Sequence, residues 1–168
     1  MNNNVPDKQT AAVCGLLCKS CGIYIATQEN NTNHLKGIAE RLHIPFEQVR
    51  CNGCRSSLLS AHCKSCYFRE CSEKKEIEFC SECNEYPCLK LKDFQTKMPH
   101  RVELFQSLER IKEAGWKKWY VETVTRHSCT KCNALNGWYD FICRSCGNKP
   151  SSPFVADNLE ILSTLKNK

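Results

Sequence analysis

The stretch CNGCRSSLLSAHCKSCYFRECSEKKEIEFCSECNEYPC, residues 51–88, sets the expected fold because it carries eight cysteines and few apolar residues. It contains a short internal repeat with a period of 17 residues: Cys54, Cys63, Cys66 and Cys71 recur as Cys71, Cys80, Cys83 and Cys88. So little apolar surface can be buried here that we expect bound metal, rather than a hydrophobic core alone, to hold the segment together. The stretch therefore predicts a small metal-stabilised domain.

Eight thiols suit two tetrahedral ions with four sulfur ligands each. A sequential arrangement gives Cys51, Cys54, Cys63 and Cys66 to one ion, and Cys71, Cys80, Cys83 and Cys88 to the other. A cross-braced arrangement stays open, because Cys71 and Cys88 stand outside the C-x-x-C pairs and can be exchanged between the ions. In a zinc knuckle, a C-x-x-C pair turns the backbone so that both sulfurs face one ion and receive amide N–H groups.

Upstream, AVCGLLCKSCGIYIATQ, residues 12–28, holds Cys14, Cys18 and Cys21 at the spacing C-x3-C-x2-C. Radical enzymes bind an iron–sulfur cluster with this spacing, but they need a β/α barrel of roughly 200 residues. Helical patterns and further cysteines follow here instead, so we expect these cysteines to be three of the four ligands of a zinc site. Its fourth ligand is His34, His43, His62 or a cysteine from residues 51–88. An iron–sulfur cluster or a labile metal- or redox-sensing site at the triplet is the alternative.

Downstream, Cys129, Cys132, Cys143 and Cys146 form two C-x-x-C pairs, and this spacing predicts a C-terminal zinc ribbon. Gly147, directly after the last ligand, and Asn133, after the first pair, are residues that adopt a positive φ, as such knuckles often require. The segment WYDFI, residues 138–142, is expected to be a strand that leads into the second knuckle. Four sulfur ligands leave no open position, so this zinc would be structural.

The remaining segments show helical periodicity. Apolar residues predict helices near residues 23–27 and 35–42, a hairpin of two helices that meet at a left-handed Gly115, and a C-terminal helix capped by Ser152 and begun by Pro153. The expected organisation is a disordered tail (1–12), a Cys-rich multi-zinc domain (13–95), a helical hairpin (96–126), the zinc ribbon (127–149) and the C-terminal helix (150–168). The expected fold class is thus small, metal-stabilised and mainly α, with short β-hairpins.

Cysteine makes up 15 of the 168 residues, an odd number that a full set of internal disulfides would not give. The polar start MNNNVPDKQT does not resemble a signal peptide, and no apolar run has the length of a membrane span. We therefore expect a cytoplasmic protein without a membrane partner, whose reduced thiols bind about three to four zinc ions.

Lys and Arg exceed Asp and Glu by 24 to 18, a formal charge of +6 that suggests nucleic acid as a partner. Metal-bound cysteines are thiolates, however, and fifteen of them with four Zn²⁺ would bring the total to about −1. Only a local patch can then support such a partner, and residues 89–132 carry ten basic against five acidic residues. Their aromatic neighbours Trp116, Trp119 and Trp138 make either a nucleic-acid surface with Lys117, Lys118, Arg126 and Lys131, or the core of the hairpin.

Four pieces of the sequence, CGLLCKSCGIYIA, CNGCR, CKSCYFREC and FCSECNEYPCLKL, resemble in this order the Cys-rich bacterial and archaeal family called domain of unknown function 3795. The resemblance covers about residues 14–91, and the later AGWKKWY with the four C-terminal cysteines is similar to an extension common in that family. The resemblance implies metal binding by Cys14, Cys18, Cys21, Cys51, Cys54, Cys63, Cys66, Cys71, Cys80, Cys83 and Cys88. It implies no reaction and no substrate.

The sequence contains no G-x-G-x-x-G or G-K-[ST] loop and no nucleophile motif, so an enzyme is not favoured. Catalysis, if present, would use an open position on a zinc ion at the triplet. The sequence favours a zinc-stabilised module that binds a macromolecule, either a protein or a nucleic acid. The sensor or iron–sulfur protein built on Cys14, Cys18 and Cys21 remains the alternative.

Overall fold

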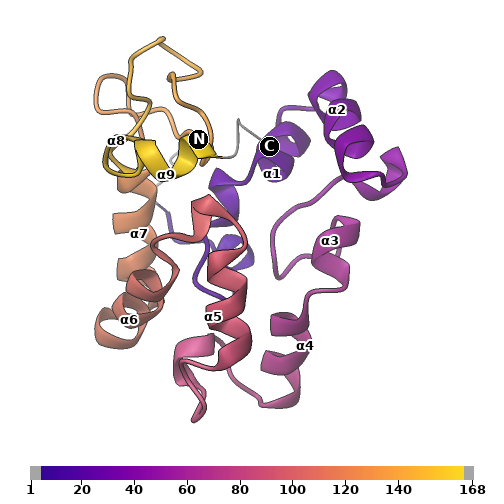
Figure 1. Cartoon of the computed structure of the whole chain (residues 1–168), viewed down its shortest axis with the longest axis vertical. Coiled ribbons are helices and arrows are strands. Elements are labelled where there is room, and N and C mark those ends of the chain that lie inside the picture. Colours follow the sequence, from indigo (N-terminus) through magenta and orange to yellow (C-terminus); the bar gives the residue numbers. More distant parts are fainter. Residues whose placement is uncertain (1–4, 165–168) are drawn as a thin grey trace.

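The computed structural model describes residues 5–164, and this part of the chain is mainly helical with no β-strand (Figure 1). Its α-helices are α1 (Gly22–Gln28), α2 (Thr32–Leu42), α3 (Ala61–Lys64), α4 (Tyr67–Lys74), α5 (Leu89–Thr96), α6 (Leu104–Ala114), α7 (Trp116–Arg126), α8 (Pro153–Asp157) and α9 (Leu159–Ser163). Five 3₁₀ turns lie between or before them: Lys8–Thr10, Cys18–Ser20, Phe46–Gln48, Cys80–Glu82 and Pro99–Arg101. No helix within residues 5–164 is long and apolar enough to cross a membrane.

The expected β-hairpins do not form in the described residues. Backbone pairing there is limited to two isolated antiparallel bridges, Ala11 with Leu17 and Ser128 with Leu135. Residues 138–142, expected to be a strand, run through turns and bends instead. The prediction of hairpins was therefore wrong, because short loops closed around cysteines satisfy their amides within the loop and need no partner strand.

The largest core is built on α6 and α7, which pack side by side as the expected hairpin (Figure 1). Leu108 and Tyr120 are fully buried between them and the N-terminal segment. Gly115 joins the two helices with φ of 80° and ψ of 153°. The expected positive φ is present, but this ψ lies outside the left-handed helical region, in a conformation that almost only glycine adopts.

Residues 7–12 differ from the disordered tail expected over residues 1–12. Lys8–Thr10 form a 3₁₀ turn capped by Asp7, and Thr10 and Ala11 are fully buried. The Thr10 Oγ1 atom lies 2.9 Å from Tyr120 Oη, a buried hydrogen bond that ties this segment to α7. The tertiary contact outweighs the polar composition, which by itself favours disorder. Residues 1–4 lie outside the described part of the chain.

A second, smaller core forms between α1 and α2 around Leu35 and Ile38. Asn31 caps the start of α2 by accepting the N–H of His34 at 3.0 Å, and His43 ends the helix in the left-handed conformation with φ of 52°. The third core joins Phe154, Val155 and Leu162 of the last two helices to Trp138 and its neighbours. Ser152 accepts the N–H of Val155, and Pro153 begins α8, as the sequence predicted.

Candidate metal centre

The four C-terminal cysteines form the clearest cluster of potential ligands. The sulfurs of Cys129, Cys132, Cys143 and Cys146 all lie within 4.8 Å of one another, and no other set of three or more His, Cys, Asp or Glu ligands meets so closely in residues 5–164. Cys129 Sγ and Cys146 Sγ are 3.7 Å apart, as are Cys132 Sγ and Cys143 Sγ. Two sulfurs on one zinc ion lie about 3.8 Å apart, given Zn–S bonds of about 2.3 Å and tetrahedral angles. These four cysteines could therefore hold a metal ion.

Both halves of this cluster have the same backbone geometry. The N–H of Asn133 bonds to the Cys129 carbonyl at 2.9 Å, and the N–H of Gly147 bonds to the Cys143 carbonyl at 3.0 Å. Asn133 and Gly147 have φ angles of 57° and 73°, so both positive-φ positions predicted from the sequence are confirmed. Because each turn closes through its own amides, the cysteine pairs are positioned without the strands of a ribbon.

Amide groups around the cluster favour thiolates. Burial alone would raise the pKa of Cys143, but the N–H groups of Cys146 and Ser145 lower it to about 6. Burial likewise opposes ionisation of Cys129, yet the N–H groups of Lys131 and Cys132 leave its pKa below the usual value. The Lys131 N–H lies 3.4 Å from Cys129 Sγ. Thiolates are the metal-binding form of cysteine, so these amides prepare the site for a cation.

A buried amide that the sequence analysis did not single out supports the second knuckle. Asn136 is fully buried, and its Nδ2 donates to the Ser151 carbonyl at 3.1 Å and lies 3.7 Å from Cys143 Sγ. Its Oδ1 accepts the N–H of Arg144 at 3.0 Å. Asn136 thus fixes the loop between the two cysteine pairs and reaches a sulfur. The only sequence signal was its position midway between the pairs.

The N-terminal triplet is spread over a turn, a 3₁₀ turn and a helix start. Cys14 is buried in a turn closed by the bond from the Ala12 N–H to the Leu16 carbonyl, Cys18 begins the second 3₁₀ turn, and Cys21 precedes α1. Burial raises the pKa of each of these thiols. Among the histidines proposed as a fourth ligand, His34 lies beside Gly22 and lines the same cavity as Cys21. His43 ends α2, and His62 is exposed on α3.

The cysteines of residues 51–88 lie at the starts and inner faces of short helices. Cys66 and Cys88 immediately precede α4 and α5, where the helix dipole favours negative charge. Cys63 lies in α3 and Cys71 in α4, while Cys80 and Cys83 flank a 3₁₀ turn. Lys75 Nζ lies 3.3 Å from Cys83 Sγ. These short helices were not predicted, because cysteines occupy inner positions that apolar residues would otherwise mark.

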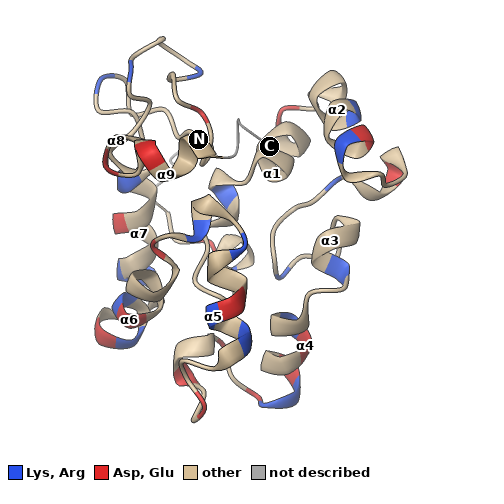
Figure 2. Ribbon diagram, viewed as in Figure 1, with Lys and Arg blue, Asp and Glu red and all other residues tan. Residues whose placement is uncertain are grey.

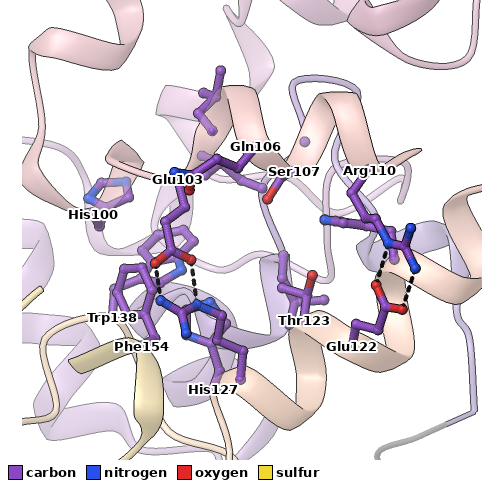
Figure 3. A pocket seen from close by; sticks show the side chains of 16 residues that line it. His100, Glu103, Gln106, Ser107, Arg110, Glu122, Thr123, His127, Trp138 and Phe154 are labelled. Atoms are coloured by element: carbon purple, nitrogen blue, oxygen red, sulfur yellow. Dashed lines mark hydrogen bonds and ion pairs between the residues drawn. The ribbon is translucent and has the colours of Figure 1, made fainter. Parts of the chain in front are cut away.

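A cavity of about 320 Å³ between α6 and α7 is the other candidate site (Figure 3). Arg126 pairs with Glu103 at one end, and Arg110 pairs with Glu122 at 2.7 Å at the other. The four charged residues that line the cavity therefore neutralise one another. Trp119 and Trp138 also line it, but Trp119 is buried in the first core, and Trp138 stacks on His100 at 4.2 Å. The tryptophans therefore serve as core residues, which was the second interpretation of their pattern.

Comparison with known proteins agrees with the cysteine pattern of the first half of the chain. Residues 10–93 match the family model described as protein of unknown function (DUF3795). The chain belongs to this family. No curated protein and no solved structure matches the chain. The DUF3795 match ends before α6, so it includes the eleven N-terminal cysteines and leaves the C-terminal four outside.

Proposed function

We propose that this DUF3795 protein is a zinc protein in which the metal is mainly structural. The observation that carries the proposal is the C-terminal set of four cysteine sulfurs within 4.8 Å of one another. Four sulfurs complete a tetrahedral shell and leave no position for a substrate, which is the arrangement of structural zinc sites. The site also joins the third core to α1, because Arg144 follows Cys143 and pairs with Glu29 at 2.7 Å. Zinc here would therefore stabilise the docking of the last third of the chain.

The metal content of the purified full-length chain, measured together with its anaerobic absorption spectrum, tests this proposal. We expect about three to four zinc ions per chain and no visible charge-transfer bands. Substitution Cys143→Ser should release one of these ions, whereas Ser145→Ala, beside it in the same loop, should release none. A protein that binds no metal in the reduced state, or one with the brown colour of an iron–sulfur cluster, would contradict structural zinc.

We propose the reducing cytoplasm as the setting, because all fifteen cysteines are unpaired. A sensor that uses the triplet has less support. Redox-sensing cysteines are exposed and have a low pKa, whereas Cys14 is buried and burial raises its pKa. The absorption spectrum described above also tests the iron–sulfur alternative directly.

For the macromolecular partner, we propose a protein rather than a nucleic acid. Basic and acidic residues lie next to one another along α6 and α7 (Figure 2), and Arg126 is paired with both Glu103 and Asp157. The tryptophans that would stack on bases are packed in the cores. By contrast, Leu89 at the start of α5 is 81% exposed, and the ammonium group of the next residue, Lys90, lies 3.7 Å from the ring centroid of the exposed Tyr67 on α4.

Filter binding to single-stranded RNA and to DNA at several salt concentrations tests this choice. We expect no affinity that falls steeply with salt, since the carboxylates of Glu122, Glu103 and Asp157 pair with Arg110 and Arg126 and interrupt the basic surface of α6 and α7. A steep salt dependence that is lost in the double variant Lys117→Ala/Lys118→Ala would favour nucleic acid instead. The matched control is Lys36→Ala/Lys64→Ala, which removes two exposed lysines from other helices.

A further inference from the structure

The knuckle Cys51–Cys54 packs against the N-terminal segment rather than standing as an independent loop. The Arg55 N–H bonds to the Gln9 carbonyl at 3.2 Å, and Arg55 Nε bonds to the Ala11 carbonyl at 3.0 Å. Gly53 has a φ of +111°, and a Cβ atom there would lie 2.6 Å from Gln9 O. This close approach holds the knuckle against residues 9–11, just before the N-terminal triplet.

The amides of this knuckle differ from those of the C-terminal cluster. In the C-terminal cluster, the N–H groups of both the second and the third residue after Cys129 act on its sulfur. In the Cys51–Cys54 knuckle, the Gly53 N–H bonds to Cys51 Sγ at 3.4 Å, but the Cys54 N–H bonds to Cys18 Sγ at 3.3 Å. The amide of the second cysteine thus reaches Cys18 rather than the first cysteine of its own pair. The two sulfurs need not serve the same ion.

Cys51 lies among Cys18, Cys21 and Cys63. Its N–H bonds to Thr27 Oγ1 at 3.1 Å, which holds it against α1, the helix that begins directly after Cys21. A hydrogen bond with the Cys63 thiol lowers the pKa of Cys51 to about 6 against the opposing effect of burial. Burial and then the nearby thiols of Cys54, Cys21 and Cys51 raise the pKa of Cys18. Since charge effects weaken with distance, these cysteines lie close together.

Cys54 lies in a different group. It lies in the largest core with Cys14, and Cys66 and Cys80 pack against that core, as do Cys18 and Cys88 at its edge; Cys51, Cys63 and Cys21 do not belong to it. The Cys80 N–H bonds to the Val13 carbonyl at 2.8 Å, which places Cys80 beside Cys14. Burial first, and then the thiols of Cys54, Cys80 and Cys66, raise the pKa of Cys14.

We propose that two interlocked metal sites share these knuckles, with one ion bound by Cys18, Cys21, Cys51 and Cys63 and the other by Cys14, Cys54, Cys66 and Cys80. The inference rests on the proposed function, since it assumes that these cysteines bind zinc. The N-terminal triplet is then divided between two ions, so it is not a single site that lacks a fourth ligand. Each pair, Cys51/Cys54 and Cys63/Cys66, contributes one sulfur to each ion. This arrangement is neither of the two derived from sequence spacing.

This arrangement would attach the N-terminal segment to the rest of the domain through both ions. Both ions link residues 14–21 to residues 51–66, so the N-terminal segment cannot detach unless both sites open. Cys71, Cys83 and Cys88 also lie near Cys80, because burial and then the thiols of Cys88, Cys71, Cys66 and Cys83 raise the pKa of Cys80 to about 12. A third group of cysteines therefore adjoins the second site.

Three double variants of the full-length chain, loaded with zinc and examined by native mass spectrometry, test the arrangement. Cys51→Ser/Cys54→Ser should lose two ions, because it damages both sites. Cys51→Ser/Cys63→Ser and Cys54→Ser/Cys66→Ser should each lose one ion, because each damages a single site twice. The control is Cys129→Ser/Cys132→Ser, which also removes a C-x-x-C pair but should lose only one ion.

The pattern of losses distinguishes the alternatives. A loss of one ion in all three test variants would overturn the interlocked sites in favour of the sequential arrangement. Equal losses of two or more ions in all three, as when the domain unfolds, would also overturn them. If the unmodified chain binds no zinc, the proposed function fails; if it binds zinc but the three losses are equal, only the interlocked arrangement fails.

Discussion

The imidazole ring of His100 lies flat against the indole of Trp138, with ring centroids 4.2 Å apart and planes inclined by 6°. His100 Nδ1 also lies 2.8 Å from the hydroxyl of Tyr139. His100 precedes α6, while Trp138 and Tyr139 belong to the loop between the C-terminal cysteine pairs. This contact therefore joins the candidate metal centre to the helical hairpin, and it keeps the imidazole buried.

A pH dependence of stability follows from this burial. Desolvation first, and then the charges of Arg101 and His62, lower the pKa of His100 to about 3. An unfolded histidine has a pKa of about 6.5, so between these values the unfolded chain binds a proton that the folded chain does not. The stabilising contribution is complete above pH 6.5 and is lost as the pH falls towards 3, by up to about 1.4 kcal/mol per pH unit.

Urea unfolding of the metal-loaded chain between pH 7 and pH 5, with metal content checked at each point, measures how the free energy of unfolding changes with pH. His100→Gln should reduce this pH dependence to the part contributed by His127, whose pKa burial also lowers to about 3. His43→Gln, at an exposed position, should leave it as in the unmodified chain. Identical slopes for the unmodified chain and His100→Gln would show that His100 is not the group responsible.

The sequence predicted local features better than those that depend on distant contacts. The C-terminal cysteine turns were predictable because Asn133 and Gly147 lie beside the ligands whose loops they close. The α6–α7 hairpin was predictable because apolar residues recur along both helices. The burial of Thr10 was not, because it depends on Tyr120, more than a hundred positions away. The spatial neighbours of Cys54 could not be predicted from the sequence either, since its N–H bonds to Cys18, which is distant in the chain.

Two glycines offer opposite stability effects from the same substitution. Gly53→Ala places a methyl group 2.6 Å from the Gln9 carbonyl oxygen at a φ of +111°, so we expect it to destabilise the fold by about 2–5 kcal/mol. Gly37 lies inside α2, and a Cβ there meets nothing within 4 Å. Gly37→Ala should therefore stabilise by about 0.5–1 kcal/mol through helix propensity. Thermal melts of both variants check the signs, and a neutral Gly53→Ala would contradict the close contact with Gln9.

Asn136 should influence the metal affinity of the C-terminal cluster without being a ligand. Asn136→Ala removes the amide that orients Cys143 and leaves the Arg144 N–H and the Ser151 carbonyl without their partner. Replacing a residue that hydrogen-bonds to a metal ligand typically weakens metal affinity about 10- to 100-fold, and we expect a loss in that range. Competition with a chelator measures it. Asn133→Gly retains the positive φ and should keep the affinity of the unmodified chain; an equal loss in both variants would contradict the specific role of Asn136.

The two arginines of the α6–α7 cavity should differ in their contributions to stability (Figure 3). Arg126 pairs with Glu103, whose side chain is 20% exposed, and with Asp157, the last residue of α8, whereas Arg110 pairs with Glu122, which is 44% exposed. Arg126→Gln leaves a half-buried carboxylate whose remaining side-chain partner is the amide of Asn158, at 2.8 Å.

We expect Arg126→Gln to destabilise the fold by about 2 kcal/mol, because a charge removed from water needs a compensating partner. Arg110→Gln should change stability much less, as is usual for exposed pairs. Urea unfolding at low and at high salt separates the two cases: salt should weaken the Arg110 contribution and leave most of the Arg126 contribution intact. Equal effects of the two substitutions would mean that Glu103 is solvated in the folded chain and that Arg126 does not hold α8 against the hairpin.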